Sequence, residues 1–467
     1  MASKSKAPLK LPQTPYTSKV AFIAGSGVIG SAVAEQLLKD GYKVCVVSRS
    51  GTKKHEQCLA VKADLYDYAQ FLAAVDVCQA KFGPISVGVC CAGELGAIQP
   101  VSAKHNRIGN PLCGIELNFA RIISPILRQR QEGAMVFMTS ALILNNIDSP
   151  HFTEVLAWAN GVAGLTDGLT PEVRQASVRV TSLLLGFVSG SKFSRRMRDM
   201  FGGKAVNPIL ADESKWVSPS DIAKSVSFVT DPASVNGTVT ELELNPQPML
   251  DKNAAFTDVK RVEEMLSKLN NPPFRDNRVA MVTGSGKGIG RGVVLELCRA
   301  GFNIAAITRT AKDLDTLAQE CKQINPKCEF LSLPLDVTDE KALEQAVQKT
   351  VEHFGTVTLV VSNAGTNRRR VAALADLKTW KDVMDVDLLA AMNLTRLTLP
   401  YLMRHARMSK LGDKPIVSYV STRYAHHKGS RMPGIAPYIT AKTATNAFAK
   451  IVSEEVRGFG VGVLGKS

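Results

Sequence analysis

Short apolar runs alternate with amphipathic segments along most of the chain. Val20–Ala24 and Val44–Val47 are typical of buried strands, and residues 28–39 between them carry apolar side chains at helical spacing. The same alternation returns from Val279 onward. Strands that alternate with helices predict βαβ units, in which helices cover both faces of a parallel sheet.

The chain contains the same unit twice. The first copy opens at Lys19 with KVAFIAGSGVIGSAVAEQLLKDGYKVCVVSRS, and the second opens at Arg278 with RVAMVTGSGKGIGRGVVLELCRAGFNIAAITRT. Each has an apolar strand, a glycine-rich turn, an amphipathic helix and a second strand that ends at a basic residue. The repeat is about 260–280 residues long, which is the length of a whole domain. We predict two tandem α/β domains of the Rossmann-like, doubly wound parallel-sheet type.

Composition shifts give the expected domain boundaries. We predict a flexible leader over residues 1–18, a first domain over 19–247, a linker rich in Pro, Asn and charge over 248–276, and a second domain over 277–467. The first copy continues into a last helix and a last strand. The second copy stops soon after the apolar stretch Val461–Leu464. We therefore expect a second domain truncated at its C-terminus, without a substrate lid.

Composition and charge exclude several classes of partner. The net charge is +15, but the basic residues are scattered and aromatic residues are only 6% of the chain, so we expect no nucleic-acid partner. No apolar run approaches the roughly 20 residues of a membrane span. The nine cysteines have no regular spacing, which favours a reducing compartment. The expected location is the cytoplasm, with the mitochondrion as the alternative.

Both glycine turns have the context of a dinucleotide-binding loop. Each follows a predicted strand and opens a predicted helix, so backbone N–H groups and the helix N-terminus would receive a pyrophosphate. The first loop is Gly25–Gly30, and the second consists of Gly284, Ser285, Gly286, Lys287, Gly288, Ile289 and Gly290. Arg309 ends the next strand where NAD-binding domains carry an acidic residue. Together with Lys287, it favours NADP(H), because arginine pairs with a 2′-phosphate.

A second constellation points to proton transfer. Tyr438 and Lys442 are four residues apart near the start of a predicted helix, so the phenol and the ammonium lie on one face. We expect the ammonium, helped by a cationic nicotinamide, to lower the pKa of the phenol toward neutrality, which would suit a general acid or base. Ser421, after the preceding strand, can bond a substrate oxygen.

In combination these motifs resemble the short-chain dehydrogenase/reductase family, close to its ketoreductases and 3-oxoacyl carrier-protein reductases. The resemblance rests on Thr283–Gly290, Asp336-Val337, Asn363-Ala364-Gly365, Ser421, and Tyr438 with Lys442. It implies that Ser421 orients a carbonyl, Tyr438 donates a proton, and Lys442 binds the nicotinamide ribose. It also implies that Asp336, Val337, Asn363, Ala364 and Gly365 line the cofactor cleft.

The sequence departs from the family pattern in both copies. In the second copy, Asp387 stands where the family has an asparagine that holds a proton-relay water, so we expect an altered relay. The segment His426–Gly434 reads as an insertion beside the substrate mouth. In the first copy, Val155 and Ala159 stand where the family has Tyr and Lys, and Cys91 replaces the asparagine of Asn-Ala-Gly. We predict that the first domain is catalytically inactive.

The expected function is an NADP-dependent ketoreductase that reduces a carbonyl, most readily a 3-oxoacyl thioester on CoA or on an acidic carrier protein. The clusters Arg368–Arg370 and Arg404–Lys410 are the predicted carrier-facing surface. Two alternatives remain open: a non-catalytic nucleotide-binding or assembly protein, and an alcohol or hydroxyacyl-CoA dehydrogenase. We expect pairing of domains, within the chain or in a homodimer. No Cys/His spacing of zinc type accompanies His426-His427, so we predict no metal site.

Overall fold

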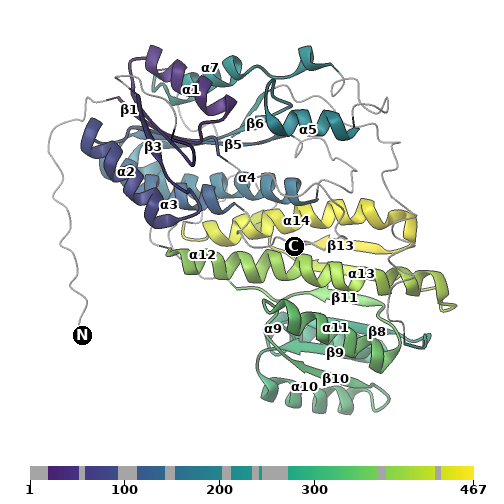
Figure 1. The fold of residues 1–467 in the computed structure, drawn as a ribbon. Coiled ribbons are helices and arrows are strands. Elements are labelled where there is room, and N and C mark those ends of the chain that lie inside the picture. Colours follow the sequence, from purple (N-terminus) through teal and green to yellow (C-terminus); the bar gives the residue numbers. More distant parts are fainter. Residues whose placement is uncertain are drawn as a thin grey trace, which may run out of the picture.

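The computed structural model describes residues 19–51, 58–92, 113–141, 153–201, 212–233, 241–244, 272–366, 375–425 and 433–466. They form two α/β domains that follow each other along the chain, as predicted (Figure 1). The predicted leader, most of the predicted linker, the Arg368–Arg370 cluster and His426-His427 lie outside the described residues.

The first domain contains a seven-stranded parallel sheet in the order β3-β2-β1-β4-β5-β6-β7. Its strands are β1 (Val20–Ala24), β2 (Lys43–Ser48), β3 (Cys58–Lys62), β4 (Val87–Cys90), β5 (Gly133–Ser140), β6 (Val178–Leu185) and β7 (Glu241–Leu244). Its helices are α1 (Val28–Lys39), α2 (Tyr68–Phe82), α3 (Gly114–Arg130), α4 (Thr153–Val173), α5 (Lys192–Phe201) and α7 (Pro219–Thr230).

The second domain contains a six-stranded parallel sheet in the order β10-β9-β8-β11-β12-β13. Its strands are β8 (Val279–Thr283), β9 (Asn303–Thr308), β10 (Phe330–Pro334), β11 (Leu359–Ser362), β12 (Ile416–Val420) and β13 (Gly462–Lys466). Its helices are α9 (Gly288–Arg299), α10 (Ala311–Ile324), α11 (Glu340–Phe354), α12 (Leu377–Met384), α13 (Ala390–Met408) and α14 (Ala436–Val456). Within the described residues, this sheet has one strand fewer than the sheet of the first domain.

Side chains along each strand point alternately to the two faces of the sheet, and a layer of helices packs on each face. In β8, Val279 and Met281 pack toward α11 and α14, whereas Ala280 and Val282 pack toward α9 and α10. Helices therefore cover both faces, and every residue of β8 is buried. The chain crosses over at β8, whose neighbours are β9 and β11. In such a sheet, ligands bind beyond the carboxyl ends of the strands at this switch point.

The two domains pack mainly through one helix from each copy, and the Arg121 Nε atom of α3 also donates to the Ala375 carbonyl oxygen of the second domain at 2.8 Å. α4 and α14 lie side by side in Figure 1 and run antiparallel. A Cβ at Gly161 would lie 3.7 Å from the Ala444 Cβ, and a Cβ at Gly168 would lie 2.7 Å from the Ala436 Cα. Each helix has 21 residues, so Gly161 and Ala444 hold the same position in the two copies. Equivalent residues meet, as they do across a two-fold axis.

A short segment ahead of β8 packs against the second domain. The Arg404 Nη2 atom donates to the Pro272 carbonyl oxygen at 2.9 Å, and the guanidinium lies 5.7 Å from the Phe274 ring centroid. Ser409 Oγ donates to the Asp276 carboxylate at 2.6 Å. These contacts place Arg404–Lys410 at the edge where the strands begin. This cluster therefore lies at the edge opposite the carboxyl ends of the strands, although the sequence analysis assigned it to a carrier-facing surface.

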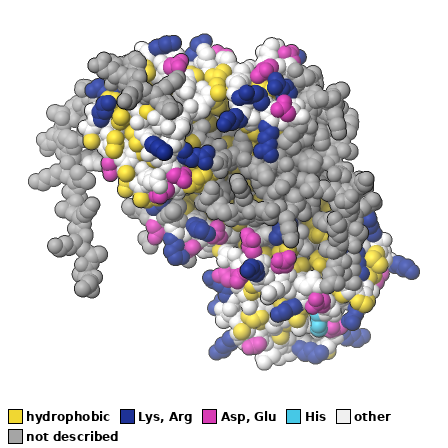
Figure 2. All heavy atoms as spheres, viewed as in Figure 1, with side chains coloured by type: hydrophobic (Ala, Val, Ile, Leu, Met, Phe, Trp, Pro, Cys, Tyr) yellow, Lys and Arg dark blue, Asp and Glu magenta, His cyan; other side chains and the backbone are white. Residues whose placement is uncertain are grey.

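The surface agrees with the scattered charge of the sequence. On the face shown in Figure 2, lysine and arginine side chains are interspersed with acidic ones rather than gathered in one patch. All nine cysteines are free thiols. Within the described part of the chain, each helix is too short or too polar to cross a membrane.

Candidate active site

The predicted site residues of the second copy follow the ends of its parallel strands. Gly284 comes directly after β8, Arg309 after β9, Asn363 after β11 and Ser421 after β12, while Asp336 lies two residues beyond β10. Because parallel strands end at one edge, the fold brings these residues together at the switch point. Tyr438 and Lys442 reach the same edge from the first turns of α14.

The glycine loop is shaped by close contact with the residue after β11. Gly284 has a φ of +63°, and a Cβ there would lie 2.9 Å from the Asn363 Nδ2 atom. A Cβ at Gly290 would lie 2.2 Å from the Gly284 carbonyl oxygen. The Asn363 side chain donates to the carbonyl oxygens of Thr283 and Gly284 at 3.0 and 3.2 Å. The Asn363 side chain thus fixes the backbone of the glycine loop. Larger side chains at the two glycines would displace the loop or the asparagine.

The open end of the loop fits a dinucleotide phosphate. Gly288 begins α9 with a φ of +55°, and no atom lies within 4 Å of the Cβ position there. Ser285 is fully buried, with its hydroxyl donating to the Ile307 carbonyl oxygen at 3.0 Å. Ile289 is 68% exposed at the same helix end. A free helix N-terminus beside unhindered backbone is the arrangement that receives a pyrophosphate.

Both cations that the sequence analysis assigned to a 2′-phosphate are exposed. Arg309 Nη1 lies 3.8 Å from the Asp336 carboxylate, and Lys287 Nζ lies 3.6 Å from the Asp313 carboxylate. Their side chains are 78% and 80% exposed, so both ion pairs are weak and both cations can turn toward a ligand. The main-chain N–H and the hydroxyl of Thr338 also donate to Asp336.

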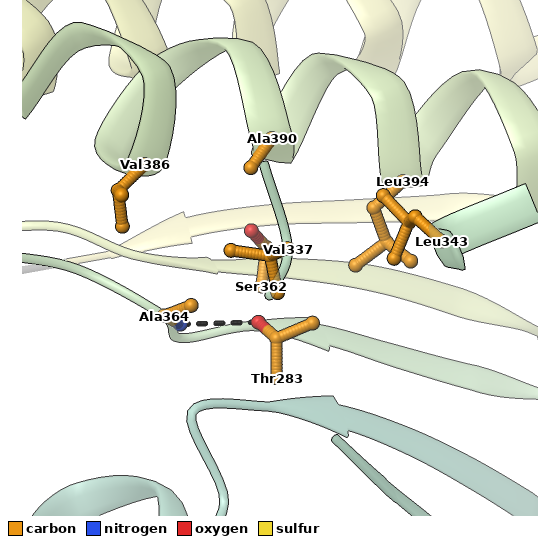
Figure 3. A pocket seen from close by; sticks show the side chains of 8 residues that line it. All are labelled: Thr283, Val337, Leu343, Ser362, Ala364, Val386, Ala390 and Leu394. Carbon is orange, nitrogen blue, oxygen red and sulfur yellow. Dashed lines mark hydrogen bonds between the residues drawn. The ribbon is translucent and has the colours of Figure 1, made fainter. Parts of the chain in front are cut away.

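Val337 and Ala364 line one apolar pocket between the strand ends and α13 (Figure 3). At one side of this pocket, the Ala364 N–H donates a hydrogen bond to the Thr283 hydroxyl oxygen at 3.0 Å. The other lining residues are Leu343, Ser362, Val386, Ala390 and Leu394. The structure therefore brings together two residues that the sequence assigned separately to the cofactor cleft.

Tyr438, Lys442 and Ser421 come together where β12 ends. The Lys442 Nζ atom lies 5.9 Å from the centroid of the Tyr438 ring and donates to the Val420 carbonyl oxygen at 3.0 Å. The Ser421 hydroxyl is buried, and it has no hydrogen-bond partner in the described part of the chain. A buried hydroxyl without a partner is costly, and a substrate oxygen would satisfy it.

Asp387 makes a direct ion pair with Lys442. Asp387 Oδ1 lies 3.2 Å from Lys442 Nζ, and both side chains are buried. The other carboxylate oxygen accepts the Thr366 N–H at 2.8 Å. Asp387 lies in a π-helical turn, residues 385–389, between α12 and α13, and the Thr445 hydroxyl of α14 donates to its carbonyl oxygen at 2.9 Å. Burial raises the pKa of Asp387, and the nearby Lys442 opposes that shift.

The pKa of Tyr438 is raised in this structure, whereas the sequence predicts a lowering by Lys442 together with a cationic nicotinamide. Burial raises the pKa of the phenol, the Asp387 carboxylate raises it further, and a hydrogen bond with Thr422 acts in the other direction. Burial is the largest cause of the raised pKa, and the ammonium of Lys442 is paired with Asp387 at 3.2 Å. Tyr438 is therefore protonated at neutral pH and can act as a proton donor.

Two threonines of this site were missed by the sequence interpretation, and a third, Thr283, was named in the glycine-rich motif without a role. Thr422 bonds the Tyr438 side chain, Thr366 anchors the Asp387 carboxylate, and Thr283 accepts the N–H groups of Asn363 and Ala364 at 3.0 Å each. Each threonine lies at the end of a strand or within four residues beyond it. Hydroxyl residues in that position are the signal that could have identified them.

The first copy has no proton donor at the equivalent place. Val155 and Ala159 are the third and seventh residues of α4, as Tyr438 and Lys442 are of α14, and both are fully buried. The Thr139 hydroxyl donates to the Ala159 carbonyl oxygen at 2.9 Å. Strand register makes Thr139 the counterpart of Ser421, since Phe137 pairs with Cys90 as Tyr419 pairs with Ser362.

Comparison with known proteins gives the same picture for both halves. The sequence profile described as short chain dehydrogenase matches residues 19–200 and 278–465. The 3-oxoacyl-(acyl-carrier-protein) reductase FabG of Thermotoga maritima is 24% identical over 183 residues, which are 39% of this chain and 70% of that protein.

Two solved structures share the tandem fold. The N-domain with NADP of a bacterial malonyl-CoA reductase has a TM-score of 0.71 at 16% identity. The match covers 96% of this chain and 90% of that chain. An N-terminal ketoreductase from a macrolactin assembly line has a TM-score of 0.60 at 13% identity and covers 99% of this chain and 80% of its own. At these identities the similarity concerns the fold alone.

Proposed function

Because the chain belongs to the short chain dehydrogenase family, we propose that it is an NADP-dependent ketoreductase whose second domain carries the reaction. The juxtaposition of Tyr438, Ser421 and the Asp387–Lys442 pair beside the glycine loop is the observation that carries this proposal. These groups supply a proton donor, a hydroxyl for the substrate oxygen and a buried charge pair at one edge of one sheet. The first domain lacks the donor.

The cofactor would be held by residues already at the switch point. The N-terminus of α9 and the open backbone at Gly288 would receive the pyrophosphate, and Arg309 with Lys287 would receive the 2′-phosphate. Val337 and Ala364 would lie along the adenosine half, and Lys442 would bind the nicotinamide ribose. When bound, the cofactor supplies the hydride.

The protein residues then handle the substrate oxygen and its proton. Ser421 donates its hydroxyl hydrogen to the carbonyl oxygen, which orients the substrate and polarises the carbonyl. Tyr438 transfers its phenolic proton to the same oxygen as negative charge develops there. A raised pKa keeps the phenol protonated at neutral pH. This state favours reduction over oxidation, because alcohol oxidation needs the phenolate as a base.

The proposed substrate is a 3-oxoacyl thioester, carried on CoA or on an acidic carrier protein. Support comes from the names of the similar proteins, a 3-oxoacyl-(acyl-carrier-protein) reductase and an assembly-line ketoreductase. Arg404–Lys410 is left out of the proposed carrier surface because it lies at the opposite edge of the sheet. Of the two basic clusters that the sequence analysis assigned to a carrier, only Arg368–Arg370 stays in this proposal, on its sequence alone.

The proposal is tested by following NADPH oxidation with the purified full chain and a short 3-oxoacyl thioester. We expect turnover with NADPH and much slower turnover with NADH. Saturable NADPH binding without turnover on a panel of ketones and 3-oxoacyl thioesters would instead favour a non-catalytic nucleotide-binding or assembly protein. Faster alcohol oxidation than ketone reduction at neutral pH would favour an alcohol or hydroxyacyl-CoA dehydrogenase.

A further inference from the structure

Two faces of α14, the helix that carries Tyr438, contact different parts of the protein. Tyr438 and Lys442 lie one above the other toward the strand ends, whereas Ala436, Thr440 and Ala444 are each two residues away from one of them. Two residues correspond to about 200° around a helix, so this second set faces away from the site. It packs against α4 of the first domain.

The contact between these helices is close enough to transmit small displacements. A Cβ at Gly164 would lie 3.0 Å from the Thr443 Cβ and 3.3 Å from the Thr440 Cα. A Cβ at Gly168 would lie 2.7 Å from the Ala436 Cα and 2.8 Å from its Cβ. The first turn of α14 therefore rests on the backbone of α4 at Gly168, and little space separates the two.

A polar contact fixes the same end of α14. The Gly434 N–H, two residues before the helix begins, donates to the Glu172 Oε1 atom of α4 at 3.2 Å. Glu172 is only 7% exposed, so this carboxylate belongs to the interior of the domain interface. It also lies at the positive end of the α14 dipole, where a negative charge is favourable.

The glutamate Glu172 of α4 has an equivalent residue in α14. Glu455 of α14 holds the position that Glu172 holds in α4, the twentieth of 21 residues, and it is also 7% exposed. Because the helices run antiparallel, Glu455 lies toward the N-terminal end of α4. That end carries Val155 rather than a tyrosine.

We propose that the inactive first domain positions the proton donor of the second, and that Glu172 is the positioning residue at this contact. Glu172 holds Gly434, Gly434 sets the entry of the chain into α14, and the first turn of α14 sets the place of Tyr438. This inference rests on the proposed function, since it concerns how Tyr438 is aligned with a substrate. It gives the first copy a role in the reaction without any chemistry of its own.

The test compares three variants of the full chain: Glu172→Ala, Glu172→Gln and Glu455→Ala. We expect Glu172→Ala to lower kcat by about tenfold or more with KM for NADPH changed less than about twofold, because misalignment affects the transition state more than cofactor binding. Glu172→Gln keeps an acceptor for the Gly434 N–H and should restore kcat to within about threefold of the wild type. Glu455→Ala should lower Tm as much as Glu172→Ala but leave kcat within about twofold.

Hydrogen exchange of the amides at residues 434–442 gives a readout that needs no turnover. Glu172→Ala should speed exchange there, and Glu455→Ala should not. Equal losses of kcat in the two alanine variants, or a glutamine variant as slow as Glu172→Ala, would overturn the inference. An inactive wild-type chain would contradict the proposed function, while the exchange comparison would still decide whether Glu172 orders the start of α14.

Gly168→Ala provides a second route if Glu172→Ala does not fold. Its methyl group would press on the Ala436 backbone, whereas the methyl group of Gly161→Ala would mainly meet the movable Cys113 side chain at 2.9 Å. We expect a loss of kcat in Gly168→Ala that exceeds the loss in Gly161→Ala by about fivefold or more. Equal activity of these two variants would contradict the proposed coupling.

Discussion

Asp387 and Lys442 form a buried ion pair in which Oδ1 and Nζ are 3.2 Å apart. The pair ties the π-helical turn before α13 to the first turns of α14, and Lys442 is also bonded to the Val420 carbonyl oxygen. Its ammonium is therefore shared among Asp387, the end of β12 and the site of the proposed ribose contact. This arrangement separates the second domain from the family pattern, which has an asparagine in place of Asp387.

Asp387→Asn should shift the pH profile of the reaction. The carboxylate raises the pKa of Tyr438, so its removal lowers that pKa. A general acid is active while protonated, and activity falls as the pH rises through its pKa. The alkaline limb of kcat against pH should therefore move to lower pH. Asp385→Asn, in the same π-helical turn but paired with Lys381, should leave the limb in place. An unshifted limb in Asp387→Asn would contradict this account.

Arg309→Ala should weaken NADPH binding selectively. The arginine is 78% exposed, so we expect a modest loss of about three- to tenfold in Kd for NADPH, and almost none for NADH. Arg299→Ala is the matched control, since Arg299 is an exposed arginine at the far end of α9. Fluorescence titration with both cofactors measures the difference. Equal weakening of NADPH and NADH binding would show that Arg309 does not contact a 2′-phosphate.

Glu116→Gln should stabilise the protein at alkaline pH. Burial raises the pKa of Glu116 to about 7 from an ordinary value of 4.5, although the Trp158 Nε1 atom donates to its carboxylate at 3.1 Å. The folded state thus binds a proton that the unfolded state loses first, and stability falls as the pH rises from 4.5 to about 7.

Above that window the ionised carboxylate costs about 3 kcal/mol. Glutamine removes this cost and can still accept the Trp158 hydrogen bond. Urea unfolding should show the variant to be more stable than the wild type at pH 8, with the advantage fading toward pH 4.5. An advantage that does not depend on pH would contradict the assignment of a buried, titrating carboxyl.

Gly27→Ala should leave NADPH binding unchanged if the first domain serves only as a structural partner. No atom lies within 4 Å of the Cβ position at Gly27, so alanine fits the fold, but it would obstruct a pyrophosphate at the start of α1. Calorimetry should give one NADPH per chain for both proteins. Two sites in the wild type and one in the variant would mean that the first domain also binds the nucleotide.

Local pattern predicted most of the fold. Apolar runs and glycine turns identify βαβ units because strand burial and loop conformation depend on residues that are close in sequence. The internal repeat then predicted the same fold for both domains. The position of each site residue relative to a parallel strand also predicts that the site residues meet at one edge of the sheet. These residues are Asn363, Ser421, Tyr438 and Lys442.

Contacts between distant segments could not be predicted in this way. The sequence identified Asp387 as unusual, but only packing shows that it reaches Lys442, 55 residues later, and that burial and Asp387 together raise the pKa of Tyr438. The hydrogen bond from Gly434 to Glu172 spans 262 residues. The basic segment Arg404–Lys410 looked available from its charge, yet Arg404 packs on Phe274 at the other edge of the sheet.

The central claim, that Tyr438 of the second domain is the proton donor, is tested most directly by Tyr438→Phe in the NADPH oxidation assay. With a 3-oxoacyl thioester, kcat should fall by about 10²- to 10⁴-fold, while Kd for NADPH stays within about twofold of the wild type. A Tyr438→Phe variant that retains full turnover would contradict the account and place the chemistry elsewhere.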